Sequence, residues 1–198
     1  MCIRDSPYLM ARRAHSRESS PIHRGVFLVR GVMGQSLRPP PVAVAPLAAD
    51  LHPGLTTRER VTLQTEPAAC MTCHRIINPL GFALENFDAV GRYRETERDK
   101  PVDSTGSYQT HTGNRVTFVG ARQLAEFVAG SEEAHAAFTE QLFHHLVQQP
   151  IRAYGDDTLD GLRESFSSAG FNIRDLAVRV MVVSAFVGQE PLASTAAD

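Results

Sequence analysis

The sequence predicts a mainly α fold, in which a small β-hairpin is followed by a helical C-terminal bundle. From Ala121 onward, apolar residues recur at the three- and four-residue spacing of amphipathic helices, with capping residues between the segments. Before that point, residues 102–109 and 115–119 are typical of two short strands. Thr112-Gly113-Asn114 between them supplies turn residues, so the two segments are expected to pair.

Length and composition fit a globular chain. Its 198 residues suffice for one domain or two small ones, and 42% of them are hydrophobic against 21% charged. The net charge of −2 leaves no clustered basic excess of the kind that nucleic-acid binding needs. No stretch approaches the roughly 18 consecutive apolar residues of a membrane-spanning helix.

The N-terminal residues show no pattern of a folded element or of a signal peptide. Met1 to Ser6 resemble translated adapter sequence from short-read assemblies, so we expect a truncated reading frame in which Cys2 is not natural. On this interpretation the absence of a signal peptide says nothing about localisation.

Two helices and a linker are expected next. Residues 23–34 are predicted to form a short apolar helix that ends at Gly34. Consecutive prolines from Pro39 then favour an extended linker. Thr56 or Thr57 can cap a second helix running to about Gln64, with Glu59 completing a capping box.

The motif Cys70-Met71-Thr72-Cys73-His74 carries the strongest chemical signal. CxxCH is the attachment motif of c-type haem, in which two thiols bond to the haem vinyl groups and the adjacent imidazole binds iron. Two intervening residues place the sulfurs about one helical turn apart. We therefore predict covalent haem c on Cys70 and Cys73, with His74 as the proximal iron ligand.

Zinc binding and dithiol redox chemistry are the alternatives for this motif. A structural zinc site needs four ligands, usually from a second Cys/His pair, and the only other cysteine is Cys2. A thioredoxin-type pair would follow a strand within a βαβ pattern, and no such pattern precedes residue 70.

Residues 78–91 follow the motif as an unusually apolar segment. Pro79 and Gly81 are expected to break the chain, and Leu84 to Asp88 to form one or two helical turns. The apolar side chains here are interpreted as a small core or as the wall of a haem pocket, two roles that overlap; they are Leu80, Phe82, Leu84 and Phe87.

Four helices are expected in the C-terminal part, over residues 121–129, 132–149 and 157–168, and after the capping residue Asn172. Along the second of these helices, His145 shares a face with Phe138 and Leu142, so it is expected to point inward.

Several of these segments resemble the large planctomycete-type cytochrome c-like secreted proteins. The similarity is most specific in CMTCHRIINPLGFALENFDAVGRYR, over residues 70–94, and residues 101–186 resemble the small helical domain that ends the same proteins. The resemblance implies Cys70 and Cys73 as thioether positions, His74 as proximal ligand and further domains N-terminal to this chain. Where many relatives have Asp, this sequence has Asn78.

These observations divide the chain into four parts. We expect a disordered or artefactual N-terminus (1–20), a cytochrome c-like haem-attachment domain (21–95) with a Pro-rich linker (38–54), a hairpin plus helical domain (101–190) and a disordered tail (191–198).

The sixth iron ligand has two weak candidates, His145 and Met181. Electron-carrier cytochromes often use a methionine several tens of residues after the motif, but no methionine lies between Met71 and Met181. An open or externally capped iron site is the alternative, and it would suit ligand binding or peroxide chemistry.

Three functions follow from these alternatives. The first is an electron-transfer module, periplasmic or at the cell surface, that serves a redox partner protein or an adjacent domain. The second is a haem enzyme, a peroxidase or dehydrogenase subunit, in which Glu85, Asp88 or Arg92 would provide acid–base chemistry. The third is a non-redox scaffold or binding module that haem or zinc stabilises.

Overall fold

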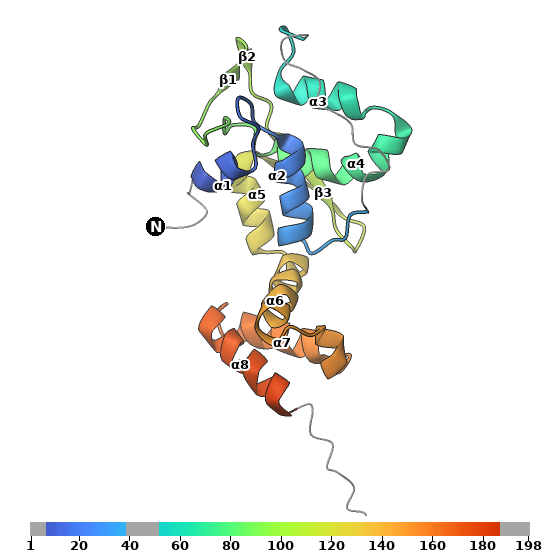
Figure 1. Cartoon of the computed structure of the whole chain (residues 1–198), viewed down its shortest axis with the longest axis vertical. Helices are drawn as coiled ribbons and strands as arrows, with labels where there is room; N and C mark the ends of the chain where they lie inside the picture. Colours follow the sequence, from blue (N-terminus) through green and yellow to red (C-terminus); the bar gives the residue numbers. More distant parts are fainter. Residues whose placement is uncertain (1–6, 39–51, 187–198) are drawn as a thin grey trace, which may run out of the picture. The chain divides into compact units, whose positions relative to one another are not determined.

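The computed structural model describes residues 7–38 and 52–186, which form two compact units that divide between Ser131 and Glu132. Both are mainly helical, which confirms the predicted fold class (Figure 1). Most of the proposed linker, Cys2 and the C-terminal tail lie outside the described residues.

The first unit contains helices and two antiparallel strand pairs. Its elements are α1 (Pro7–Arg12), α2 (Pro21–Phe27), the π-helical turn η2 (Leu28–Val32), α3 (Thr57–Thr65), α4 (Ala68–Phe82), β1 (Thr96–Glu97), β2 (Lys100–Pro101), β3 (Thr105–Gln109), β4 (Arg115–Val119) and α5 (Gly120–Ala129). The capping box predicted for α3 is present, because Thr56 Oγ1 accepts from the Glu59 backbone N–H while the Glu59 carboxylate accepts from that of Thr56.

Helices α2 and α4 cross at very short range (Figure 1). A Cβ atom at Gly25 would lie well inside 3.0 Å of the Ile77 carbonyl oxygen, and one at Gly81 equally close to that of Pro21. The two backbones approach this closely because each helix places a glycine at the crossing. This contact fixes the C-terminal half of α4.

The predicted hairpin is confirmed. Strands β3 and β4 pair antiparallel, with Thr105 opposite Val119 and Gln109 opposite Arg115. Tyr108 and Phe118 point to the buried side, where Phe127 of α5 packs against both rings. The short pair β1–β2 had no counterpart in the sequence prediction, since two-residue strands show no periodicity.

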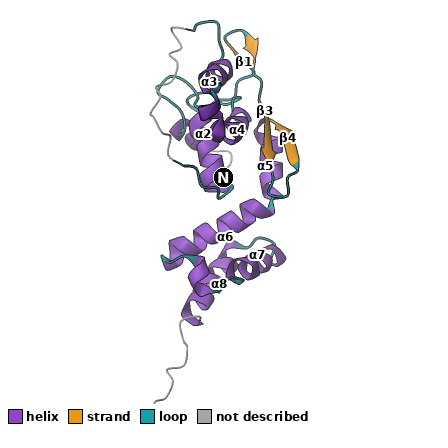
Figure 2. Ribbon diagram, turned by 90° about the vertical axis from the view of Figure 1, so that its right-hand side faces the viewer, coloured by secondary structure: helices purple, strands orange, loops and turns teal. Residues whose placement is uncertain are grey.

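The second unit is a helical bundle around an apolar core. It comprises α6 (Glu132–Val147), the 3₁₀ turn η4 (Ile151–Tyr154), α7 (Thr158–Ser168) and α8 (Ile173–Phe186). Figure 2 shows α6 lying along α7 and α8, and the three helices contact one another. The core side chains are Phe143, Ile151, Leu162, Phe166, Leu176 and Val180.

The expected break at Pro79 and Gly81 is wrong, since α4 continues to Phe82. Proline removes one backbone donor and normally disrupts a helix interior. Here α2 packs across Gly81, and the backbone of Gly106 in β3 approaches the Pro79 carbonyl. Tertiary packing on two sides therefore holds the helix through a local break signal.

The boundary between the compact units also differs from the expected one. The sequence predicts a boundary between residues 95 and 101, whereas the hairpin and α5 belong to the first unit, which ends at Ser131. The reason is the packing of β3 against α4.

Part of the N-terminal segment expected to be disordered is folded. Within residues 7–20, α1 is followed by a bridge between Ala14 and Ser19. The side chain of Ser20 then caps α2 by accepting from the His23 backbone N–H.

Candidate functional site

The CxxCH motif lies in the first turns of α4, directly after Pro67. Because the whole motif is helical, Cys70, Cys73 and His74 stand at i, i+3 and i+4 and share one face of the helix. Both thiols are free and partly buried. Two thiols and an imidazole on one helix face match the donor set that covalent haem attachment requires.

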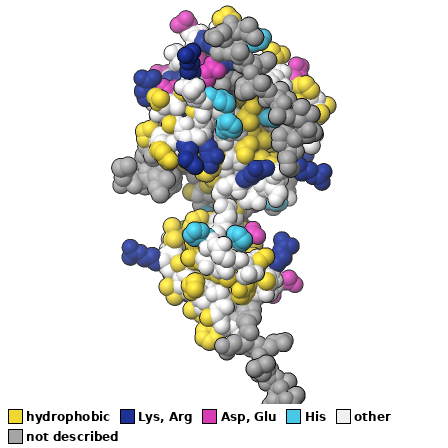
Figure 3. All heavy atoms as spheres, in the orientation of Figure 1, with side chains coloured by type: hydrophobic (Ala, Val, Ile, Leu, Met, Phe, Trp, Pro, Cys, Tyr) yellow, Lys and Arg dark blue, Asp and Glu magenta, His cyan; other side chains and the backbone are white. Residues whose placement is uncertain are grey.

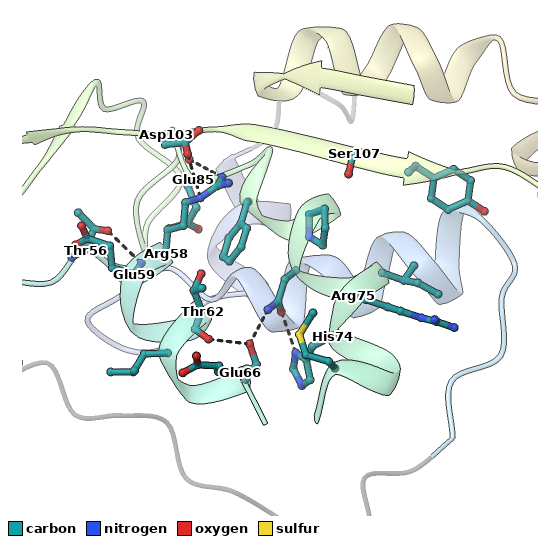
Figure 4. Close-up of a pocket in the computed structure, with 18 of the residues that line it drawn as sticks. Thr56, Arg58, Glu59, Thr62, Glu66, His74, Arg75, Glu85, Asp103 and Ser107 are labelled. Atoms are coloured by element: carbon teal, nitrogen blue, oxygen red, sulfur yellow. Dashed lines mark hydrogen bonds and ion pairs between the residues drawn. The ribbon is translucent and has the colours of Figure 1, made fainter. Parts of the chain in front are cut away.

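His74 opens onto a cleft of about 1170 Å³ in the first unit (Figure 4). This volume is slightly above the ~300–1,000 Å³ typical of ligand pockets, so the cleft has room for a cofactor-sized ligand. The apolar lining includes Leu63, Met71, Ile76, Pro79, Phe82 and Val102. Cys70 and Cys73 do not line the cleft themselves but stand beside Met71 and His74 in the helix.

Two buried polar side chains that also line the cleft position the His74 ring: Asn78 contacts the ring, and Thr65 contacts Asn78. The Nδ1 atom of His74 lies 2.8 Å from Asn78 Oδ1, one turn further along α4. The Asn78 amide in turn donates to Thr65 Oγ1 of α3 at 2.8 Å. With Nδ1 engaged, Nε2 is the ring nitrogen left for a ligand, and second-shell contacts of this kind orient metal-binding histidines.

Glu85 reaches the same cleft from the segment after α4. Its carboxylate is buried, accepts from Ser19 Oγ at 2.9 Å, and pairs with Arg94 at 3.2 Å and Arg24 at 3.6 Å. Burial raises the pKa of Glu85 to about 7, although Arg24, Ser19 and Arg94 favour the ionised form. A group with this pKa exchanges its proton near neutrality.

Arg24 is a buried residue of this cluster that sequence reasoning missed. Its guanidinium donates to the carbonyls of Leu84, Phe87 and Asp88, so it fixes the segment that carries Glu85. The one sequence signal was an arginine within the apolar run 23–34, and its partners lie about 60 residues away in the chain.

Asp88 and Arg92, the other acid–base candidates, pair with each other at 2.9 Å. Asp88 Oδ1 also accepts from the backbone N–H groups of Val90 and Arg92, and the Arg92 side chain is 81% exposed. Their contacts are those of a turn-stabilising pair. Neither residue lines the cleft.

The candidate distal ligands lie in the other compact unit. His145 is exposed on α6, so its predicted inward orientation is wrong: the helix faces the core with Ala134, Ala137 and Phe143 instead. Met181 is 51% exposed on α8. Among the histidines of the first unit, His111 at the hairpin turn lines the same cleft as His74.

A zinc site gains no support from the described residues. Among residues 7–38 and 52–186, no group of three or more His, Cys, Asp or Glu side chains is placed to hold a metal ion. Cys70, Cys73 and His74 would therefore lack a fourth protein ligand of these types in this part of the chain.

None of the described helices has the length and apolar character that a membrane span requires.

Comparison with known proteins gives one match. No curated protein and no solved structure matches the chain significantly. Residues 3–97 match the family PSCyt3, described as a protein of unknown function (DUF1588). The matched part includes α1 to α4, the CxxCH motif and Glu85, and the family name points to the planctomycete cytochrome c-like proteins that the sequence around residues 70–94 resembles.

Proposed function

We propose that this chain is a c-type cytochrome-like haem-binding module that transfers electrons within a larger exported protein. The observation that carries the proposal is the placement of CxxCH on one helix face, with His74 opening onto a partly apolar cleft. Haem, when bound, supplies a one-electron redox centre. The similarity of residues 3–97 to PSCyt3 supports the same reading.

Each motif residue has a distinct part in this proposal. Cys70 and Cys73 would form the two thioether bonds, and His74 would bind the iron through Nε2. The apolar side chains of the cleft, among them Ile76 and Phe82, would exclude water from the haem face. A drier surrounding lowers the local dielectric constant and so raises the effect of nearby charges on the potential.

The compartment and the partner are part of the same proposal. Bacteria attach haem to CxxCH outside the cytoplasm, so the proposed site of action is the periplasm or the cell surface. The electron would pass to a redox partner protein or to an adjacent domain of the full-length protein.

A pyridine haemochrome spectrum tests this function. The full chain is exported in a host that carries c-haem maturation enzymes, then denatured and extracted with acid–acetone. A c-type α band that survives extraction is the expected result. Colourless protein would overturn the proposal.

Cysteine variants test whether haem is covalently attached to Cys70 and Cys73. Cys70→Ala together with Cys73→Ala should remove the covalent haem, whereas each single variant should shift the α band toward that of haem b. Thr72→Ser is the matched control, since Thr72 lies between the two cysteines, is exposed and does not line the cleft, so attachment should be unchanged. Retention of covalent haem by the double variant would contradict the assignment.

A haem enzyme is the second candidate, and Glu85 is the observation that favours it. A buried carboxyl group with a pKa of about 7 that lines the cleft is suited to general acid–base chemistry. Spectral shifts on addition of cyanide or peroxide to the loaded protein would support this candidate. Unchanged spectra would favour electron transfer.

A further inference from the structure

Three side chains that line the cleft, Thr65, Asn78 and His74, form a chain of hydrogen bonds with a fixed direction. Thr65 Oγ1 donates its single proton to the Val61 carbonyl at 2.7 Å, as a helical threonine commonly does. Its oxygen can therefore only accept from Asn78, whose amide lies 2.8 Å away. Thr65 thus determines which end of the Asn78 amide faces it.

The same logic extends to the imidazole. Because the NH₂ group of Asn78 faces Thr65, its carbonyl oxygen faces His74. A carbonyl accepts but never donates, so Nδ1 of His74 must carry a proton. A neutral His74 then has its lone pair on Nε2, the atom that binds iron in the proposed site.

Burial makes this chain of bonds difficult for water to replace. Thr65 is 3% exposed and Asn78 is 6% exposed. Removal of either partner would leave a buried polar group without its hydrogen bond, which is costly. The contact also spans two helices, since Thr65 ends α3 and Asn78 lies in α4.

We propose that Thr65 and Asn78 are positioning residues that hold His74 in its Nδ1-protonated tautomer and set its donor strength toward a bound haem iron. The effect on the reduction potential rests on the proposed function, whereas the choice of the His74 tautomer does not. Donor strength follows because the acceptor on Nδ1–H controls the electron density that Nε2 offers to the metal.

Substitutions at residue 78 separate this role from a purely structural one. Asn78→Asp keeps an acceptor and makes it stronger, so the reduction potential of the loaded protein should fall. Asn78→Leu keeps the approximate size but removes the acceptor, so the potential should rise. Shifts of opposite sign are the expected result, and shifts of the same sign, or none, would overturn the inference.

Substitutions at residue 65 test the second bond. Thr65→Ser keeps the hydroxyl and should leave the potential at its original value, whereas Thr65→Val should shift it in the direction of Asn78→Leu. Thr139→Val is the matched control, because Thr139 is equally buried and donates to the His135 carbonyl at 2.9 Å in the other unit. An unchanged potential in Thr65→Val, or a shifted one in Thr139→Val, would contradict the proposed role.

A readout without haem keeps the two proposals distinguishable. In the unloaded full chain with ¹⁵N-labelled histidine, the imidazole nitrogen shifts should show His74 protonated at Nδ1, and Asn78→Leu should move it toward the Nε2-protonated form. A chain that fails to bind haem but shows this change would overturn the proposed function alone. An Nε2-protonated His74 in the original sequence would overturn the inference alone.

Discussion

The two compact units bury different kinds of side chain. In the first unit, buried charged and polar groups include Arg24, Arg60, Thr65, Asn78 and Glu85, and the last three of these line the cleft. In the second unit, Thr139 is the one described polar residue that is buried, and the core is otherwise apolar. Buried polar networks specify one arrangement of their members, whereas an apolar core chiefly supplies stability. The difference suggests that the first unit is built around a site.

The surfaces of the units differ as well. In the second unit, α8 exposes Val178, Met181, Val182 and Phe186, each about half exposed or more. Figure 3 shows hydrophobic side chains over the surface of this unit. Nothing in the structure indicates what covers this surface, so we assign it no partner.

The largest expected effect comes from the apolar core of the second unit. Phe143 is fully buried, and Phe143→Ala should lower the free energy of unfolding by about 4 kcal/mol, because it loses apolar burial and leaves a cavity. Urea unfolding of the full chain, followed by circular dichroism, measures the loss. The neighbouring His144→Ala, at an exposed position, should change stability by less than about 0.5 kcal/mol. A small effect of Phe143→Ala would show that this core does not stabilise the unit.

The helix crossing of the first unit should be nearly as sensitive, for the opposite reason. Gly25→Ala adds a methyl group where the Ile77 backbone already fills the space, so we expect a loss of about 3 kcal/mol from overpacking. Gly161→Ala in α7 is the control, because nothing lies within 4 Å of its added Cβ. That variant should gain roughly 0.5–1 kcal/mol in urea unfolding. If Gly25→Ala and Gly161→Ala changed the free energy of unfolding equally, the close packing at Gly25 would not limit the stability of the first unit.

The Glu85 cluster should make the stability of the first unit depend on pH. The folded-state pKa of Glu85 is about 7 against an ordinary 4.5, so the folded protein binds this proton more tightly than the unfolded chain. Stability from this group is therefore highest below pH 4.5, falls between pH 4.5 and 7, and is level above. The shift corresponds to about 3 kcal/mol over that window.

Comparison of stability against pH in the original protein and in Glu85→Gln isolates this contribution. Arg24, Arg94 and Glu97 act on the carboxylate in both directions, so the difference between the two curves is the informative quantity. Glu59→Gln is the control, since Lys100 lowers the pKa of that exposed carboxyl group and its contribution has the opposite sign. The stability of the original protein minus that of Glu85→Gln should fall as the pH rises from 4.5 to 7. If this difference rises with pH instead, the assigned pKa of Glu85 is contradicted.

Local signals in the sequence predicted most of the elements correctly. The capping residues Thr56 and Asn172 and the turn at Gly113 act within a few residues, so the chain itself contains the information. The course of α4 through Pro79 could not be predicted in this way, because α2 and β3 hold it from distant parts of the chain.

The features of the candidate site also fall into those that local sequence predicts and those that depend on packing between distant segments. The motif Cys70 to His74 was evident from the sequence, and the i, i+4 relation of Asn78 to His74 would have followed from a helix drawn through Pro79. The Thr65 and Arg24 contacts depend on packing between elements, which residue patterns do not specify. The outward orientation of His145 likewise depends on where α7 and α8 pack.

The smallest expected effect compares one helix cap from each unit. Thr56 is 8% exposed and belongs to a reciprocal capping box, whereas Asn172 is exposed and only accepts, from the backbone N–H groups of Arg174 and Asp175. Thr56→Ala should therefore cost about 1.5 kcal/mol and Asn172→Ala about 0.7 kcal/mol in urea unfolding. If Asn172→Ala costs as much as Thr56→Ala, burial and the reciprocal bond from Glu59 add nothing to the cap. The polar contacts of the first unit would then be no stronger than those at the surface of the second.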